Sequence, residues 1–254
     1  MTCLVCGQPM HPVNTGHGTH PACDMTTVTD LELDHAMSQA LRDLDIPRFE
    51  QMAAEADRRR GELIDRLTQP GALAAAALWY AEQNLPVFPC RPADKNPAIP
   101  SAHPAGSPER ATCRGQCGRH GHGLYDATTN LDQIRAWWTQ WPQANIGLPT
   151  GGTYDVIDID GPPGYRSLAT LKAEDNFPPT YLGRAITPRG GMHYYIPATG
   201  DGNATAVMPG IDYRGTGGYV IAPPSRAASG RRWEWTNPLT TTGYNTVYTW
   251  EAGQ

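Results

Sequence analysis

The sequence predicts a mixed α/β (α+β) protein, and both composition and patterning lead to this fold class. The chain has 254 residues, of which 39% are hydrophobic, so it can bury a globular core. Its 27 glycines and 24 prolines indicate many turns and short strands rather than a helical bundle. Segments with helical periodicity alternate with short apolar segments that end in glycine turns.

Charge and hydropathy exclude some classes of protein. The formal net charge is −5, so nucleic-acid binding would have to come from local patches or through metal ions. No apolar run approaches the roughly 20 residues that span a membrane. The N-terminus lacks the basic and apolar regions of a secretory signal. We therefore expect a cytoplasmic protein without a membrane partner.

The first 26 residues are predicted to form a zinc ribbon. They contain two pairs of metal-ligand residues, each with two residues between its members: Cys3 and Cys6, then His20 and Cys23. Such pairs suit tetrahedral Zn²⁺, and a segment this short needs the metal to supply its folding energy. His17 is an alternative to His20, and a disordered tail with free thiols is the alternative interpretation.

A helical connector is expected over residues 27–69, followed by the main domain over residues 70–254. The connector is charged and helix-prone, and Pro47 is expected to divide it into two helices. Its basic cluster, residues 58–60, fits a solvated helix face better than a contact with nucleic acid.

The main domain begins with helical patterns. Residues 71–85 are rich in alanine and predict a helix. Residues 126–142 predict a second helix, capped by Asn130 or Thr129. Its aromatic stripe is more typical of core packing than of a base-stacking platform.

A second cluster of histidines and cysteines interrupts this domain at about residues 101–123. Cys113 and Cys117 are separated by three residues, with His103 before them and His122 after them. These four residues are the expected ligands of a second Zn²⁺, with His120 as a substitute for His122. A flexible loop with two free thiols is the alternative.

The chain is organised around residues 153–161, TYDVIDIDG. This segment predicts a buried strand that ends in two carboxylates and breaks at Gly161-Pro162-Pro163. Asp158 and Asp160 share one face because strand side chains alternate, whereas Asp155 belongs to the opposite face. Two adjacent carboxylates repel unless a cation lies between them, and oxygen ligands suit Mg²⁺ or Mn²⁺. The alternative is that one Asp caps a turn and the other is solvated.

Two further segments supply partners for this strand. Residues 187–197, TPRGGMHYYIP, predict a turn at Gly190 and Gly191 that leads into a strand bearing His193. Residues 210–225, GIDYRGTGGYVIAPPS, place Asp212 and Arg214 on one strand face, and their glycines are expected to turn the chain back into YVIAPP. A third carboxylate on a neighbouring strand is what a two-metal site requires. Phosphate contacts are expected from basic residues near these strands: Arg189, His193, Arg214 and Lys95.

Together, VIDIDG, TPRGGMHYYI and GIDYRGTGGYVIAPPS resemble the bifunctional primase-polymerase (prim-pol) family of the archaeo-eukaryotic primase superfamily, common in phages and plasmids. The resemblance covers about residues 70–238. It implies a catalytic core related to the RNA-recognition fold, with a zinc-binding insertion in some members. It also implies that Asp158, Asp160 and Asp212 are ligands of two Mg²⁺ or Mn²⁺ ions, and that His193 contacts the nucleotide phosphates.

The expected activity is therefore template-directed primer synthesis on single-stranded DNA from NTPs or dNTPs. A separately encoded replicative helicase is a further expected partner. Two alternatives belong to other classes. A D-x-D glycosyltransferase would explain VIDIDG but not Asp212, and a zinc-dependent nucleic-acid-binding module would have no catalytic activity.

Overall fold

A computed structural model describes residues 37, 40, 43, 45–68, 72–239 and 245–246. The chain divides into two compact units, Met1–Leu63 and Ile64–Gln254. The four predicted ligands of the N-terminal zinc ribbon lie outside the described residues, as does His17, so that ribbon stays a prediction. No helix within the described ranges is long and apolar enough to cross a membrane.

The first unit contains most of helix α2 (Ile46–Thr68). Pro47 is its second residue, a position where the missing N–H leaves no hydrogen bond unmade, so the proline starts this helix. The Arg58 guanidinium pairs with Glu55 and Glu62 on successive turns. This part of the basic cluster is therefore a charge-paired helix face.

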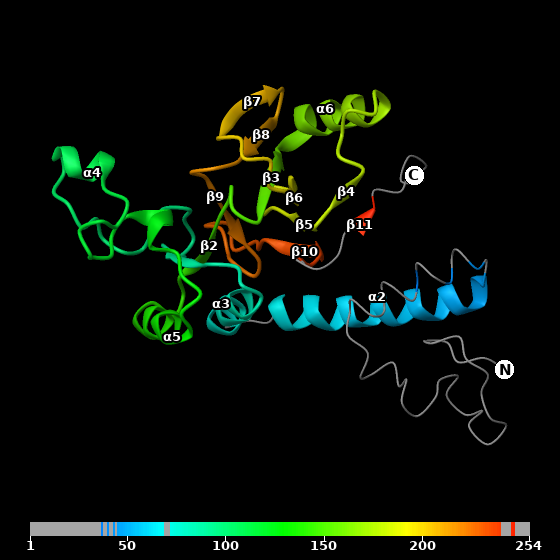
Figure 1. Ribbon diagram of the computed structural model, residues 1–254, viewed down its shortest axis with the longest axis horizontal. Coiled ribbons are helices and arrows are strands. Elements are labelled where there is room, and N and C mark those ends of the chain that lie inside the picture. Colours follow the sequence, from blue (N-terminus) through cyan, green and yellow to red (C-terminus); the bar gives the residue numbers. More distant parts are fainter. Residues whose placement is uncertain are drawn as a thin grey trace, which may run out of the picture. The chain divides into compact units, whose positions relative to one another are not determined.

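The second unit has helices on two sides of its strands (Figure 1). Asn130 caps α5, because its side-chain oxygen accepts from the backbone N–H groups of Asp132 and Gln133 at 3.0 Å each. The helical elements of this unit are α3 (Leu73–Glu82), α4 (Pro108–Thr112), the 3₁₀ helix η3 (Gly123–Asp126), α5 (Leu131–Gln140) and α6 (Gly161–Ala173).

The strands form a six-stranded and a three-stranded sheet together with a small two-stranded one. The larger sheet has the order β10-β5-β6-β3-β8-β7, and all its pairs are antiparallel. It comprises β3 (Tyr154–Ile159), β5 (Gly183–Ile186), β6 (Met192–Pro197), β7 (Ala204–Met208), β8 (Ile211–Arg214) and β10 (Glu234–Asn237). The three-stranded sheet comprises β1 (Phe88–Cys90), β2 (Asn145–Pro149) and β9 (Tyr219–Ala222), and β4 (Thr180–Tyr181) pairs with β11 (Asn245–Thr246).

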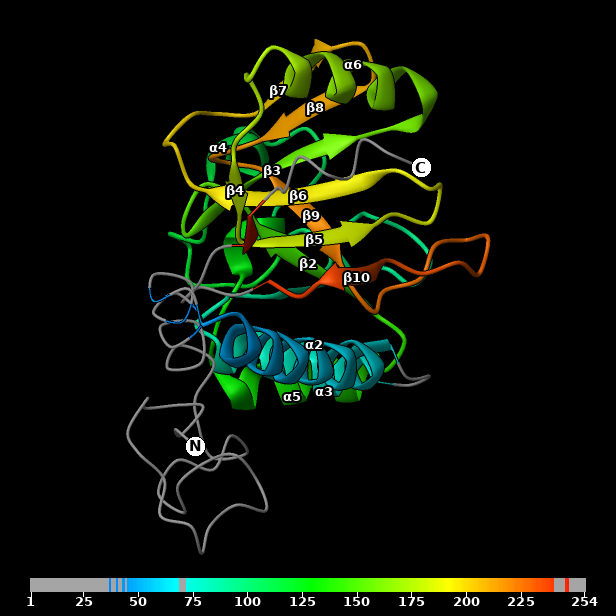
Figure 2. The ribbon, with the colours of Figure 1, turned by 90° about the vertical axis from the view of Figure 1, so that its right-hand side faces the viewer.

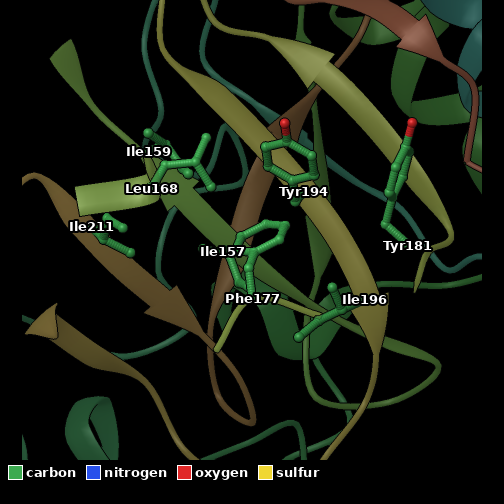
Figure 3. Close-up of a cluster of buried hydrophobic side chains, with 8 residues drawn as sticks. All are labelled: Ile157, Ile159, Leu168, Phe177, Tyr181, Tyr194, Ile196 and Ile211. Carbon is green, nitrogen blue, oxygen red and sulfur yellow. The ribbon is translucent and has the colours of Figure 1, made fainter. Parts of the chain in front are cut away.

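One face of the six-stranded sheet is an apolar core. Alternate residues of the central strands point to it and meet α6 and the segment that follows α6 (Figure 3). The cluster consists of Ile157, Ile159, Leu168, Phe177, Tyr181, Tyr194, Ile196 and Ile211. Asp155 has the same parity, and its Oδ2 accepts hydrogen bonds from Thr199 and from the Tyr213 hydroxyl, which satisfies a fully buried carboxylate oxygen within the chain.

The other face is tied to α3 by aromatic side chains. The Trp235 indole donates to the Tyr80 hydroxyl at 2.9 Å, and that hydroxyl donates to the Pro223 carbonyl at 2.7 Å. The Trp235 and Tyr195 rings lie 5.1 Å apart. Trp137 and Trp138 are buried on α5, so the aromatic stripe is core packing as predicted.

The structure changes three local expectations. The strand was expected to break at Gly161-Pro162-Pro163. These residues instead form the first turn of α6, where prolines are tolerated. Strand β9 pairs with β2 in the smaller sheet, so the glycines after β8 carry the chain from one sheet to the other. The C-terminal segment, which had no predicted structure, contributes the edge strand β10.

Candidate active site

Three neighbouring strands bring three of the predicted site residues together, whereas Asp158, Asp160 and Asp212 do not gather their ligand atoms into one group. Strand β3 lies between β6 and β8 in the sheet, and Asp158 is opposite His193 on one side and Asp212 on the other. Directly opposite residues point to the same face, so these three side chains form a row across the sheet. This face is the one opposite the apolar core.

Arg214 connects the two carboxylates of this row. Its Nη2 lies 2.7 Å from Asp212 Oδ2 and 3.4 Å from Asp158 Oδ2. The Asp158 side chain is only 7% exposed. A carboxylate this buried requires a positive neighbour or hydrogen-bond donors, and one guanidinium nitrogen supplies positive charge to two acids.

Asp160 lies just past the end of β3, at the N-cap of α6. Its side chain makes no capping hydrogen bond, so the capping alternative is wrong for this residue. Both carboxylate oxygens of Asp160 instead lie 3.3 Å from Arg189 Nη2. Asp160 is more exposed than Asp158, with 41% of its side chain accessible.

The glycine turn before β6 packs against the end of β3. A Cβ at Gly191 would lie 2.3 Å from the Ile159 carbonyl oxygen and 3.2 Å from Asp160 Oδ1, so only glycine fits. Gly190 has φ of +79°, which also favours glycine. The predicted close approach of backbone at this turn is therefore to the acidic strand itself.

His193 is buried beside Asp158, with its Nε2 3.5 Å from Asp158 Oδ1. Burial lowers the pKa of His193, and the negative charge of Asp158 only partly opposes this shift. The imidazole is therefore neutral near pH 7. Its Nδ1 has no hydrogen-bond partner among the described residues.

A cavity of about 280 Å³ opens beside this row. Four predicted site residues line it: Lys95, Asp158, His193 and Arg214. The other predicted residues, Asp160, Asp212, Arg189, Gly190 and Gly191, do not line the cavity.

Three polar or aromatic residues of the cavity wall were not predicted: Asn203, Tyr219 and Trp233. The buried Trp233 Nε1 has no acceptor among the described residues, although an indole N–H nearly always finds one. The Lys95 ammonium lies 6.0 Å from the centre of the Trp233 ring, and the Tyr219 hydroxyl donates to the Lys95 carbonyl at 3.0 Å. The tryptophan-rich segment WEW, residues 233–235, was a signal for Trp233 in the sequence, but nothing in the sequence marked Asn203.

The insertion gathers the second set of predicted ligands. The ligand atoms of His103, Cys113, Cys117 and His122 all lie within 4.8 Å of one another, and this is the one such group among the described residues. The Nε2 atoms of the two histidines are 3.3 Å apart, and Cys117 Sγ is 3.4 Å from His122 Nε2. His120 lies outside the group, with its ring 5.5 Å from that of Trp137.

The surroundings of this group resemble those of a metal centre. Asp126 accepts from the backbone N–H groups of Gly121 and His122 at 2.8 Å, and its Oδ1 lies 3.4 Å from His122 Nδ1. His122 Nδ1 has no hydrogen-bond partner among the described residues, so Asp126 lies near the ring without a hydrogen bond that fixes its orientation. The pKa of Cys117 is lowered to about 6, mainly by a hydrogen bond from the Arg119 backbone, which favours the thiolate form that binds metals.

Comparison with known proteins identifies the family of the chain. No curated protein matches the sequence. The family model described as "Bifunctional DNA primase/polymerase, N-terminal" matches residues 77–245, which is more than half of the chain and includes all three strands of the acidic row. The resemblance expected from the three motifs is thereby confirmed, and the chain belongs to the bifunctional DNA primase/polymerase family.

Proposed function

We propose that the protein is a template-directed nucleotidyltransferase that synthesises primers on single-stranded DNA. The observation that carries this proposal is the row formed by His193, Asp158 and Asp212 on three adjacent strands, with a cavity beside it. Family membership supports a DNA template and nucleotide substrates in general terms, without specifying the reaction or the nucleotide. The rest of the assignment is drawn from the chemistry of the side chains.

The carboxylates fit a site for divalent cations. Arg214 Nη2 is shared by Asp158 and Asp212, so one positive atom already lies between two carboxylate oxygens. Hard oxygen donors of this kind suit Mg²⁺ or Mn²⁺. We assign Asp158 and Asp212, with Asp160 beside them, as the ligands of two such ions. When bound, the ions would acidify the attacking hydroxyl and neutralise the leaving pyrophosphate.

The cavity is the proposed seat of the incoming nucleotide. Lys95 supplies a positive charge to the cavity wall, and Trp233 supplies an N–H donor without an acceptor among the described residues. Arg214 lines the same cavity, so it can turn toward a phosphate when it leaves the carboxylates. His193 is neutral and can donate one hydrogen bond to a phosphate oxygen without the desolvation cost of a buried charge.

The His/Cys group is proposed to hold one structural Zn²⁺. In a tetrahedral site with Zn–N of about 2.05 Å, two nitrogens lie about 3.3 Å apart, and a nitrogen and a sulfur lie about 3.5 Å apart. The corresponding distances here are 3.3 Å and 3.4 Å. Two histidines and two cysteines complete such a site, which leaves no open position for catalysis.

Other expectations rest on the family alone. They include a core related to the RNA-recognition fold, replication of a phage or plasmid, and work alongside a separately encoded helicase. The N-terminal ribbon at residues 1–26 and the connector at 27–69 would be additions to the catalytic domain. The antiparallel sheet with α6 on one face is compatible with the proposed relation.

Primer synthesis on single-stranded DNA tests the proposal. The purified chain is incubated with a template and either NTPs or dNTPs, with Mg²⁺ or Mn²⁺. Wild type should extend or initiate primers, and D158A or D160A should lose this activity by at least about 10²-fold while remaining folded. D132A is the control, because Asp132 is an exposed carboxylate on α5 that pairs only locally with Arg135.

The outcomes separate the candidate functions. Tight template binding without incorporation under either metal would favour the non-catalytic module. Transfer from a nucleotide sugar, in place of nucleotide incorporation, would favour the glycosyltransferase. If either acidic variant makes primers at the wild-type rate, the assignment of these carboxylates is wrong.

A further inference from the structure

A short hairpin between β9 and β10 carries three arginines that the proposed chemistry does not use. We call residues 225–233 the arginine hairpin; its arginines are Arg226, Arg231 and Arg232. The Trp233 N–H donates to the Ser225 carbonyl at 3.0 Å, and the Ala227 N–H donates to the Arg231 carbonyl at 2.9 Å. Gly230 turns the chain with φ of +80°.

Two of these arginines are placed directly opposite each other. Arg226 and Arg232 form an antiparallel bridge between the two hydrogen-bonded positions. Such a non-hydrogen-bonded pair brings side chains closer than any other pairing, and like charges there destabilise a hairpin. Burial and the charge of Arg226 lower the pKa of Arg232, while Glu234 opposes this shift. Arg232 has a further partner within the chain, so the charge left for an external anion to offset is that of Arg226.

The hairpin is held rigidly despite this repulsion. The Asn145 side chain on β2 donates to the Arg226 carbonyl at 2.8 Å and accepts from the Arg226 N–H at 2.9 Å. The Ser225 hydroxyl accepts from the Ile146 N–H at 2.9 Å. The backbone that presents Arg226 is therefore anchored to the smaller sheet, and little ordering is needed when a ligand binds.

A cavity of about 230 Å³ lies beside the hairpin. It is lined by Ile186, Thr187, Gly230, Arg231, Arg232 and Glu234. The turn that contains Thr187 also carries Arg189, which contacts Asp160. The β3–α6, β5–β6 and β9–β10 connections all leave the same end of the six-stranded sheet (right-hand side of Figure 2).

We propose that the arginine hairpin binds the phosphodiester backbone of single-stranded DNA as the strand approaches the acidic site. The choice of DNA as the anion rests on the proposed function. Guanidinium groups bind phosphate oxygens in a bidentate manner, and the exposed Arg226 with the half-buried Arg232 can contact neighbouring phosphates. Within the described part of the chain, neither the Arg226 nor the Arg231 guanidinium forms an ion pair. A chain with a net charge of −5 needs such a local patch to hold a polyanion.

The test compares charge-matched double variants of the full chain. R226Q/R232Q removes the opposed pair, and R135Q/R166Q removes two exposed arginines on α5 and α6. Binding of a fluorescein-labelled oligo-dT strand is measured by anisotropy over a range of salt concentrations, in buffer without Mg²⁺, Mn²⁺ or nucleotide. Binding of a fluorescent dNTP in the presence of Mn²⁺ is measured separately.

R226Q/R232Q should lose about tenfold in affinity for the strand, and its salt slope should fall by about 1.4, the value for two lost phosphate contacts. The control variant and R226K/R232K should keep the wild-type slope. Binding of the dNTP should not change, because neither arginine lines the cavity beside the row. Unchanged strand affinity in R226Q/R232Q overturns the inference even where wild type incorporates nucleotides. Loss of dNTP binding together with strand binding also overturns it, since the arginines would then serve the nucleotide site. Strand binding that depends on the hairpin in a protein without incorporation would keep the inference and refute the polymerase assignment.

Discussion

Replacing Arg214 with methionine tests whether the guanidinium stands where a metal ion would bind. The change removes the positive atom that lies 2.7 Å from Asp212 and 3.4 Å from Asp158, and it keeps most of the side-chain length. Stripping a partner from a fully buried ion pair costs about 3–5 kcal/mol, whereas an exposed pair contributes less than about 1 kcal/mol. Asp158 is buried but the Arg214 side chain is 28% exposed. We therefore expect R214M to lose about 1–2 kcal/mol of unfolding free energy, or roughly 2–8 °C in melting temperature.

The informative measurement is the thermal shift caused by Mn²⁺. In metal-free buffer R214M should melt below wild type, because two carboxylates then face each other without a cation. Added Mn²⁺ should raise the melting temperature of R214M more than that of wild type, since the arginine no longer competes. A site filled at about 100 times its dissociation constant contributes about 2.7 kcal/mol, which is enough to reverse the order of stabilities.

Two further variants make the result decisive. R135M removes an exposed arginine that pairs only with the neighbouring Asp132 on the same helix, and it should change neither the stability nor the Mn²⁺ shift. The double variant D158N/R214M should lose the enhanced shift. If R214M is as stable as wild type and responds to Mn²⁺ no more strongly, the carboxylate row is not a cation site and the reasoning fails.

Three other perturbations address separate parts of the molecule. W233F should weaken binding of a fluorescent dNTP about tenfold and leave oligo-dT binding unchanged, because it removes one N–H donor from the cavity wall; equal dNTP affinity would place the nucleotide elsewhere. N145A should lower the unfolding free energy in urea by about 2–4 kcal/mol, since its buried amide bonds the Asp94 carbonyl and both backbone groups of Arg226; a loss below about 1 kcal/mol would mean that water replaces those bonds. Removal of zinc should expose Cys113 and Cys117 to alkylation at pH 7, with Cys117 reacting faster because its pKa is lowered to about 6, while Cys90 stays protected by burial. Alkylation is measured by mass spectrometry. Equal alkylation of Cys113 and Cys117 before and after chelation would argue against a metal at the His/Cys group.

The sequence predicted which strand face each residue of the row occupies, because the alternation of side chains along a strand is a local pattern. The alternation of side chains alone placed Asp158 and Asp155 on different faces of the sheet. It also placed His193 and Tyr194 on different faces. The α5 cap at Asn130 followed from a short-range side-chain preference. Ligand spacing in the insertion likewise selected the four side chains that the fold brings together.

What the sequence could not predict depends on contacts between distant segments. The glycines after β8 looked like a hairpin turn, but the register of β9 is set by its partner β2, some seventy residues earlier. Trp233 and Asn203 reach the cavity from loops whose neighbours are fixed only by that sheet arrangement. The prolines after Asp160 permit either a break or a first helical turn, and packing of α6 on the apolar face decides between them.

The burial of Asp158 links metal binding to the position of Arg214. A carboxylate on the central strand, with only 7% of its side chain exposed, is unstable without a cation nearby. In the structure described, Arg214 provides that charge, so on the proposed function a divalent ion must displace it. A ligand that holds Arg214 away from Asp158 and Asp212 must therefore strengthen metal binding. By linkage, the metal strengthens binding of that ligand by the same factor. The cavity that Arg214 lines is where a triphosphate would do this, and nucleotide and metal should therefore bind with positive cooperativity.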